Sequence, residues 1–97
     1  MLHVIATNHV LACNHSKFLE IAEELVRLTR QEDGCIAYSL TKSNDNPDIL
    51  VYVETWQSKS HFEAHTSSEH FTRIIPNLRA LRHKDTDVVF LEDAVIL

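Results

Sequence analysis

Residues 35–56 read CIAYSLTKSNDNPDILVYVETW, and this stretch decides the fold because it carries the pattern of a β-hairpin. Its first part predicts a strand with Ile36, Tyr38 and Leu40 on one face. Its last part, residues 49–56, predicts a second strand because β-branched and aromatic side chains dominate the run. The segment between them is rich in Asn, Asp and Pro, which is typical of a turn. Two strands joined by a short polar loop predict an antiparallel hairpin.

A helix and a strand are predicted before the hairpin. Over residues 16–31 the apolar side chains fall three or four apart, with charged side chains mostly on the other side. Gly34 is expected to end this helix, because glycine enters the left-handed conformation without steric cost. Residues 2–11 alternate and predict a half-buried strand, on which Asn8 falls on the otherwise apolar side.

Two helical pieces and a strand are predicted after the hairpin. The first piece starts at Ser58, and the polar stretch 67–69 predicts a break and a new helix cap. Apolar residues at helical spacing over 71–81 predict the second piece, in which Pro76 should produce a kink or a division. Residues 87–91 predict a fourth strand, and the four residues that end the chain either extend it or dock elsewhere.

The order of the elements predicts an α+β, ferredoxin-like βαββαβ fold. Its antiparallel four-stranded sheet carries the helices on one face. Both faces of the hairpin are fairly apolar, so we expect a second subunit to cover the open face in a two-fold symmetric homodimer. A length of 97 residues fits one domain that spans residues 1–97.

Composition excludes several function classes. A net charge of −5 disfavours nucleic acid as a partner, because that binding depends on neutralising phosphates. The single glycine excludes Gly-rich dinucleotide and phosphate loops. No apolar run approaches the ~20 residues of a membrane span, and the apolar start is too short for a signal peptide. Two distant cysteines favour a reducing compartment, so we expect a cytoplasmic protein without a membrane partner.

Two histidines near the helix break are candidate catalytic residues. His65 and His70 flank the junction of the two helical pieces, and histidine is the usual general base near neutral pH. The alternative is a structural role for each, in capping or packing at the helix ends. His61 and His65 are spaced to share a helix face, but no third ligand is placed beside them, so no metal site is expected.

Polar side chains on apolar strand faces are candidates for binding a ligand. Glu54 and Trp56 share one face of the strand over residues 49–56, where they can hold a phenolic ligand. The alternative is a carboxylate at the rim and an indole in the core. Asn8 needs a hydrogen-bond partner or a ligand on its apolar face, and the backbone is the alternative partner.

Together, four segments resemble the antibiotic biosynthesis monooxygenase (ABM) family. They are DGCIAY at residues 33–38, VETWQSK at 53–59, FEAH at 62–65 and HF at 70–71, and their order and spacing match across residues 2–91. The resemblance implies a dimeric α+β barrel. It also implies a ligand pocket in each subunit between the sheet and the helices.

The resemblance implies a cofactor-independent monooxygenase that oxidises a small electron-rich aromatic, such as a quinol or an anthrone, with O2. His65 or His70 would then be the base, Asn8 and Trp56 would position the ring, and Tyr52 and Glu54 are further candidates for binding the substrate. Haem degradation is disfavoured, because that branch has Trp at the position of His65 and an axial His at the position of Ile75.

Two other functions stay open at this point. One is an isomerase of a small phosphorylated ligand, which needs a cationic anchor. The available cations are Lys59, Arg73, Arg79, Arg82 and Lys84. The other is a stress-response dimer that binds aromatic ligands without turning them over.

Overall fold

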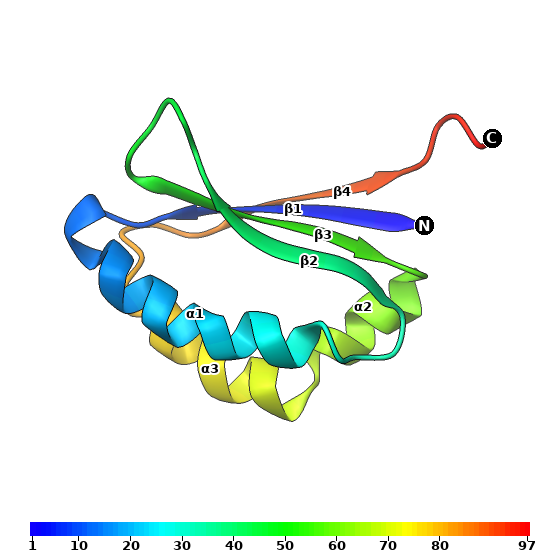
Figure 1. Cartoon of the computed structure of the whole chain (residues 1–97), viewed down its shortest axis with the longest axis horizontal. Coiled ribbons are helices and arrows are strands. Elements are labelled where there is room, and N and C mark those ends of the chain that lie inside the picture. Colours follow the sequence, from blue (N-terminus) through cyan, green and yellow to red (C-terminus); the bar gives the residue numbers. More distant parts are fainter.

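The computed structural model describes all 97 residues and shows a four-stranded antiparallel sheet with the helices on one side of it (Figure 1). This arrangement confirms the predicted βαββαβ fold, and the strands lie side by side in the order β2-β3-β1-β4. The elements along the chain are β1 (Leu2–His9), a short 3-10 turn (Ala12–Asn14), α1 (His15–Thr29), β2 (Cys35–Lys42), β3 (Ile49–Trp56), α2 (Lys59–Thr66), α3 (Glu69–Arg79) and β4 (Asp87–Glu92).

The helix boundaries follow local chemistry. Ser58 caps α2 by accepting from the His61 backbone N–H, and Ser68 caps α3 by accepting from the Phe71 backbone N–H, which confirms the predicted break. Gly34 has a φ of +78°, as expected for the turn that follows α1. Pro76 does not divide the last helix, because α3 continues to Arg79.

The prediction that Ile36 shares a face with Tyr38 is wrong, because a β-bulge interrupts β2 between Cys35 and Ala37. Cys35 pairs with Trp56, whereas Ala37 pairs with the residue directly before Trp56, so Ile36 is the extra residue. The bulge shifts the alternation by one residue. Cys35 therefore packs against the core, while Ile36 is 54% exposed.

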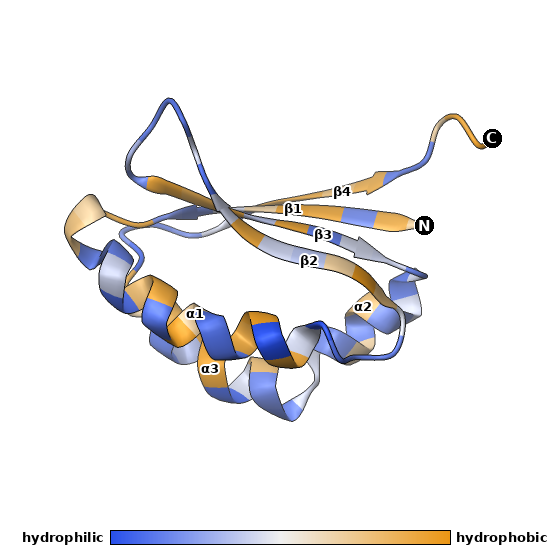
Figure 2. Ribbon diagram, viewed as in Figure 1, coloured by the Kyte–Doolittle hydropathy of each residue, from blue (hydrophilic) through white to orange (hydrophobic).

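The hydrophobic core fills the space between the sheet and the helices. Apolar and polar residues alternate along α1 (Figure 2), and its buried residues Phe18, Ala22, Leu25 and Thr29 recur at helical spacing. The largest fully buried apolar side chains come from both layers: Trp56, Phe18, Leu25, Leu50 and Leu78. None of the helices combines the length and the apolar character that crossing a membrane requires.

The opposite face of the sheet is bare in the single chain (Figure 1). Ile5 pairs with Val53 on one side and with Val89 on the other, so the three side chains share this face. Val53 is 42% exposed and Val89 is 50% exposed. An apolar sheet face of this kind is usually covered by another layer.

Candidate functional site

A cavity of about 200 Å³ lies between the sheet and the two C-terminal helices. Four of the predicted site residues line it: Asn8, Tyr52, Glu54 and His65. His70 and Trp56 do not line it. Trp56 donates a hydrogen bond to Glu54 at its wall, whereas His70 is hydrogen-bonded to Glu32, which lies outside the wall. A larger, more open groove of about 710 Å³ runs along α1 and β2, but it contains no buried polar side-chain atom that lacks a partner.

His65 is completely buried and is held by a carboxylate that the sequence analysis did not identify. Its Nδ1 atom lies 2.6 Å from Glu32 Oε2, and its Nε2 atom has no hydrogen-bond partner. His70 Nε2 lies 2.8 Å from the same carboxylate oxygen. One carboxylate therefore accepts hydrogen bonds from two imidazole rings, one of which lines the cavity.

The turn after α1 brings Glu32 to the histidines. The Cα of Gly34 packs so closely against the His61 side chain that a Cβ at this position would overlap the ring. This contact holds α2 against the turn. His61 and His65 are one helical turn apart, so they share a face of α2, and His65 meets Glu32 in that same turn.

The hydrogen bonds indicate which nitrogen of His65 is free. An ionised Glu32 only accepts hydrogen bonds, so Nδ1 of His65 carries the proton and Nε2 carries the lone pair. Burial lowers the pKa of His65, and the hydrogen bond that its ring donates to Glu32 only partly opposes this effect. The ring is therefore neutral near pH 7, and its Nε2 can accept a proton from a ligand in the cavity.

Glu54 and Trp56 form a buried pair beside His65. The indole Nε1–H donates to Glu54 Oε1 at 2.9 Å, and the centroids of the Trp56 and His65 rings are 4.8 Å apart. Burial raises the pKa of Glu54 to about 7, although the hydrogen bond from Trp56 acts in the opposite direction. Trp56 supports the wall of the cavity from behind, and Glu54 faces the cavity as a carboxyl group that titrates near neutral pH.

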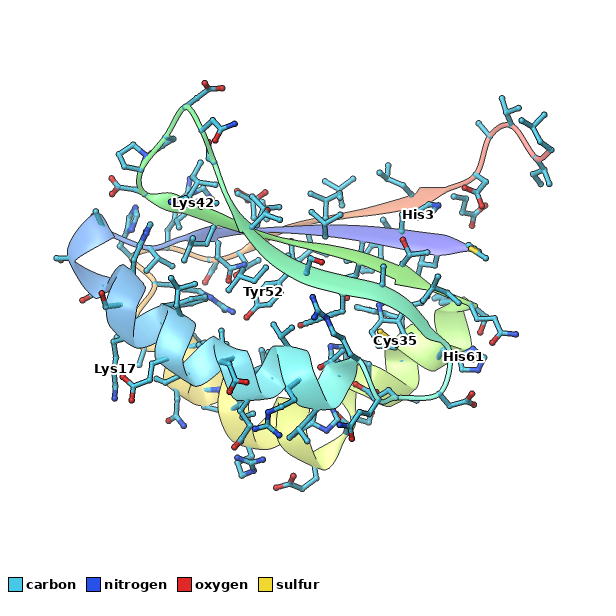
Figure 3. All side chains as sticks on the ribbon, in the orientation of Figure 1. His3, Lys17, Cys35, Lys42, Tyr52 and His61 are labelled. Carbon is cyan, nitrogen blue, oxygen red and sulfur yellow. The ribbon has the colours of Figure 1, made fainter.

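Asn8 and Tyr52 lie further along the sheet. The side-chain amide of Asn8 donates to the Ala6 carbonyl at 3.0 Å, and its oxygen accepts from the Thr86 hydroxyl at 3.3 Å. Asn8 therefore has hydrogen-bond partners within the chain, including a backbone carbonyl, as expected if its role is structural. The buried hydroxyl of Tyr52 has no partner, and Figure 3 shows this side chain between the sheet and the helices.

Only two of the cations considered as anchors reach the cavity. Arg79 and Arg82 line it. Arg73 instead pairs on the surface, with its Nη1 atom 2.6 Å from Glu24 and its Nε atom 2.7 Å from Glu69. Lys59 pairs loosely at 3.9 Å with a glutamate on its own helix, and Lys84 does not line the cavity.

One cluster has the composition of a metal site. The ligand atoms of Glu32, His65 and His70 all lie within 4.8 Å of one another, and imidazole with carboxylate suits zinc or iron. The same atoms make the hydrogen bonds described above. A metal ion at this place would therefore have to displace the protons that join the histidines to Glu32.

Comparison with known proteins assigns the chain to a family. The fold and its cavity define a ferredoxin-like α+β protein that can enclose a small molecule. The family model of the antibiotic biosynthesis monooxygenases matches residues 1–77, and the chain belongs to this family.

Relatives of known sequence or structure agree with this assignment. The Bacillus subtilis protein named "Putative monooxygenase YcnE" is 28% identical over 76 residues, which cover 78% of this chain and 80% of that protein. A crystal structure of an antibiotic biosynthesis monooxygenase has a TM-score of 0.92 at 34% identity, covering 98% of this chain and 100% of that one. A conserved Methanosarcina mazei protein has a TM-score of 0.90 at 30% identity, covering 93% of this chain and 89% of the other.

Proposed function

We propose that the protein is a monooxygenase that oxidises a small electron-rich phenol with O2 and needs no metal or flavin. The observation that carries the proposal is the hydrogen-bonded Glu32–His65 pair: His65 is buried, lines a largely apolar cavity and has an Nε2 atom without a partner. Family membership supports the reaction class. The pair supplies a base that is oriented by a carboxylate and kept away from bulk water.

In the proposed mechanism, His65 removes the proton of the substrate hydroxyl and becomes an imidazolium that Glu32 stabilises. The electron-rich phenolate passes one electron to O2, and the resulting radical pair combines to form a ring peroxide anion. This anion takes the proton back from the His65 imidazolium and becomes a hydroperoxide. Loss of water then leaves a carbonyl on the ring. One oxygen atom enters the product and the other leaves as water, while the substrate loses two hydrogens.

The residues around the base have supporting roles in this proposal. His70 is a positioning residue, because it donates to Glu32 and not to the cavity. Trp56 fixes the plane of the His65 ring by packing against it. The volume of about 200 Å³ lies below the ~300–1,000 Å³ of drug-sized pockets, so one or two fused rings suit it better than the three rings of an anthrone.

We also propose that two copies of the chain associate through the bare face of the sheet. The side chains of Ile5, Val53 and Val89 form an apolar strip there that no element of the chain covers. Packing two such faces together would bury this strip and form the α+β barrel that the resemblance implies.

The test is oxygen uptake by chelator-treated protein with a panel of hydroquinones, naphthols and anthrones. Saturable uptake above the rate of heat-treated protein is expected for a one- or two-ring substrate. His65→Gln should lower turnover by about 10²–10⁴-fold, because it replaces the base by an amide that can still form hydrogen bonds but cannot take up the proton. Glu32→Gln should lower it less, since the base stays and only its orientation and charge support are weakened.

His83→Gln is the matched control, because His83 is exposed and does not line the cavity. Full turnover by His65→Gln with a confirmed substrate would refute the assignment of the base. Activity that is lost with chelator and restored by zinc or iron would instead assign the Glu32, His65 and His70 cluster to a metal. Binding of aromatic ligands without oxygen uptake would favour a non-catalytic binding protein.

A further inference from the structure

Three residues of the cavity wall each carry a buried side-chain atom that has no hydrogen-bond partner in the chain: His65 Nε2, Tyr52 Oη and Arg82 Nε. The fourth such atom, Thr29 Oγ1 on α1, belongs to a residue outside the cavity wall. Unpaired polar atoms in a protein interior cost free energy, and most are paired in native structures. Three of them around one cavity indicate a ligand that pairs with them.

The three atoms differ in what they offer a ligand. His65 Nε2 accepts a hydrogen bond. Arg82 Nε can only donate, and although burial lowers the pKa of this guanidinium, arginine keeps its charge at neutral pH. Burial raises the pKa of Tyr52 above its usual range, so its hydroxyl keeps its proton and can donate. The cavity thus offers one acceptor and two donors, of which one is a cation.

No carboxylate neutralises this cation. Neither Arg79 nor Arg82 takes part in an ion pair, whereas Arg73 on the same helix as Arg79 has two carboxylate partners. Asp85 is the acidic residue that acts on Arg82, and its influence is smaller than that of burial. Glu54 also lines the cavity, but it accepts from Trp56 and forms no ion pair with either arginine. Two guanidinium groups that line a cavity and have no carboxylate partner are typical of an anion-binding site.

The acceptor and the cation belong to different parts of the cavity. His65 packs on Trp56, at the C-terminal end of β3. Tyr52 precedes Trp56 by four residues on the same strand, which corresponds to about 13 Å along it. Asn8 on β1 pairs with Leu50, near the start of β3, and it accepts a hydrogen bond from Thr86. The segment after Arg82 therefore lies near the start of β3, away from Trp56.

We infer that the cavity binds a substrate with an ionised acidic group, a carboxylate or a phosphate, at the end opposite its reactive hydroxyl. Arg82 and Tyr52 hold the acidic group, Arg79 adds positive charge at the cavity wall, and the hydroxyl meets His65. This inference rests on the proposed function for the role of the hydroxyl. The anion subsite itself is a statement about binding and does not depend on turnover.

The test is calorimetric titration of the full chain under nitrogen, where no oxidation can occur. The probes are 2-naphthol, 6-hydroxy-2-naphthoate with its groups at opposite ends, and 3-hydroxy-2-naphthoate with its groups adjacent. The 6-hydroxy acid should bind about tenfold or more tightly than either other probe, since one charge-assisted hydrogen bond is worth at least that factor. Competition by acetate or by inorganic phosphate then distinguishes a carboxylate from a phosphate subsite.

Arg82→Gln should abolish the preference for the acid, measured as the affinity for 6-hydroxy-2-naphthoate relative to that for 2-naphthol in the same variant. Arg82→Lys should retain part of the preference, because it keeps the charge but loses the Nε donor. Arg73→Gln is the matched control and should behave as the wild type. A wild-type protein that does not prefer the 6-hydroxy acid, or a preference that survives in Arg82→Gln, overturns the inference.

The two Arg82 variants must first show the wild-type circular dichroism spectrum. If neither folds, the wild-type preference and its competition by the two anions decide the question alone. Tight binding of the acid without oxygen uptake would support the anion subsite and refute the monooxygenase proposal. Oxygen uptake with 2-naphthol but no preference for the acid would support the monooxygenase proposal and refute the anion subsite.

Discussion

Replacing Glu54 by glutamine should change how the stability of the protein depends on pH. Glu54 is 5% exposed, and burial raises its pKa from 4.5 to about 7. Because the folded pKa lies above the unfolded one, the stability that this group contributes is fully present below pH 4.5. It is lost as pH rises through about 7. A difference of about 2.5 pKa units corresponds to about 3 kcal/mol, since each unit is worth about 1.4 kcal/mol.

The assay is urea unfolding of the wild type and Glu54→Gln between pH 4 and pH 9, at one protein concentration. Glutamine keeps an oxygen that accepts from the Trp56 indole, so the variant should match the wild type near pH 4. It should be more stable by about 3 kcal/mol above pH 8. Glu63→Gln, which changes an exposed carboxylate on α2, should show no such trend. Parallel stability curves for the wild type and Glu54→Gln would refute a buried carboxyl group with a raised pKa.

Three further perturbations test the turn, the base and the open sheet face. Gly34→Ala should lower the free energy of unfolding by about 1–3 kcal/mol through its positive φ, and by more through the overlap with His61. Urea titration measures this loss, with the neighbouring surface change Asp33→Ala for comparison. Equal stabilities of the two variants would contradict the prediction. The pH profile of kcat/KM tests the base and is measured in Glu54→Gln, so that Glu54 does not titrate. The value of kcat/KM should rise with pH through a midpoint below 6.5 and then level off, because burial lowers the pKa of His65 and only its neutral form accepts a proton. A midpoint above 7 would assign the base elsewhere. Val53→Lys should convert a dimer into a folded monomer in light scattering, whereas Glu20→Lys on the outer side of α1 should not; a dimer that persists in Val53→Lys would place the interface on another face.

The sequence predicts the fold well because each boundary has a local cause. Ser58 and Ser68 cap the two C-terminal helices through their own hydroxyl groups, and Gly34 occupies the one position with positive φ. Such signals lie within a few residues of the boundary they specify. The bulge at Ile36 has no such signal, because it depends on how β2 pairs with a strand that comes later in the chain.

The candidate site is predictable only in part, for the same reason. Strand alternation places Asn8, Tyr52 and Glu54 on the buried face correctly. The partner of His65 is Glu32, which is 33 residues away and becomes its neighbour only when α2 packs against the turn. The acidic residue just before the Asp33-Gly34 stop was the available signal, but nothing in the sequence shows which histidine it meets.

The strand order has a consequence for how the chain is made. The sheet places β1, which is synthesised before the other three strands, in its interior, between β3 and β4. Until residues 87–92 have been synthesised, one edge of β1 has unpaired backbone groups, and its apolar side chains flank a ready template for another strand. Nascent or C-terminally shortened chains should therefore be the species that aggregate and that chaperones hold.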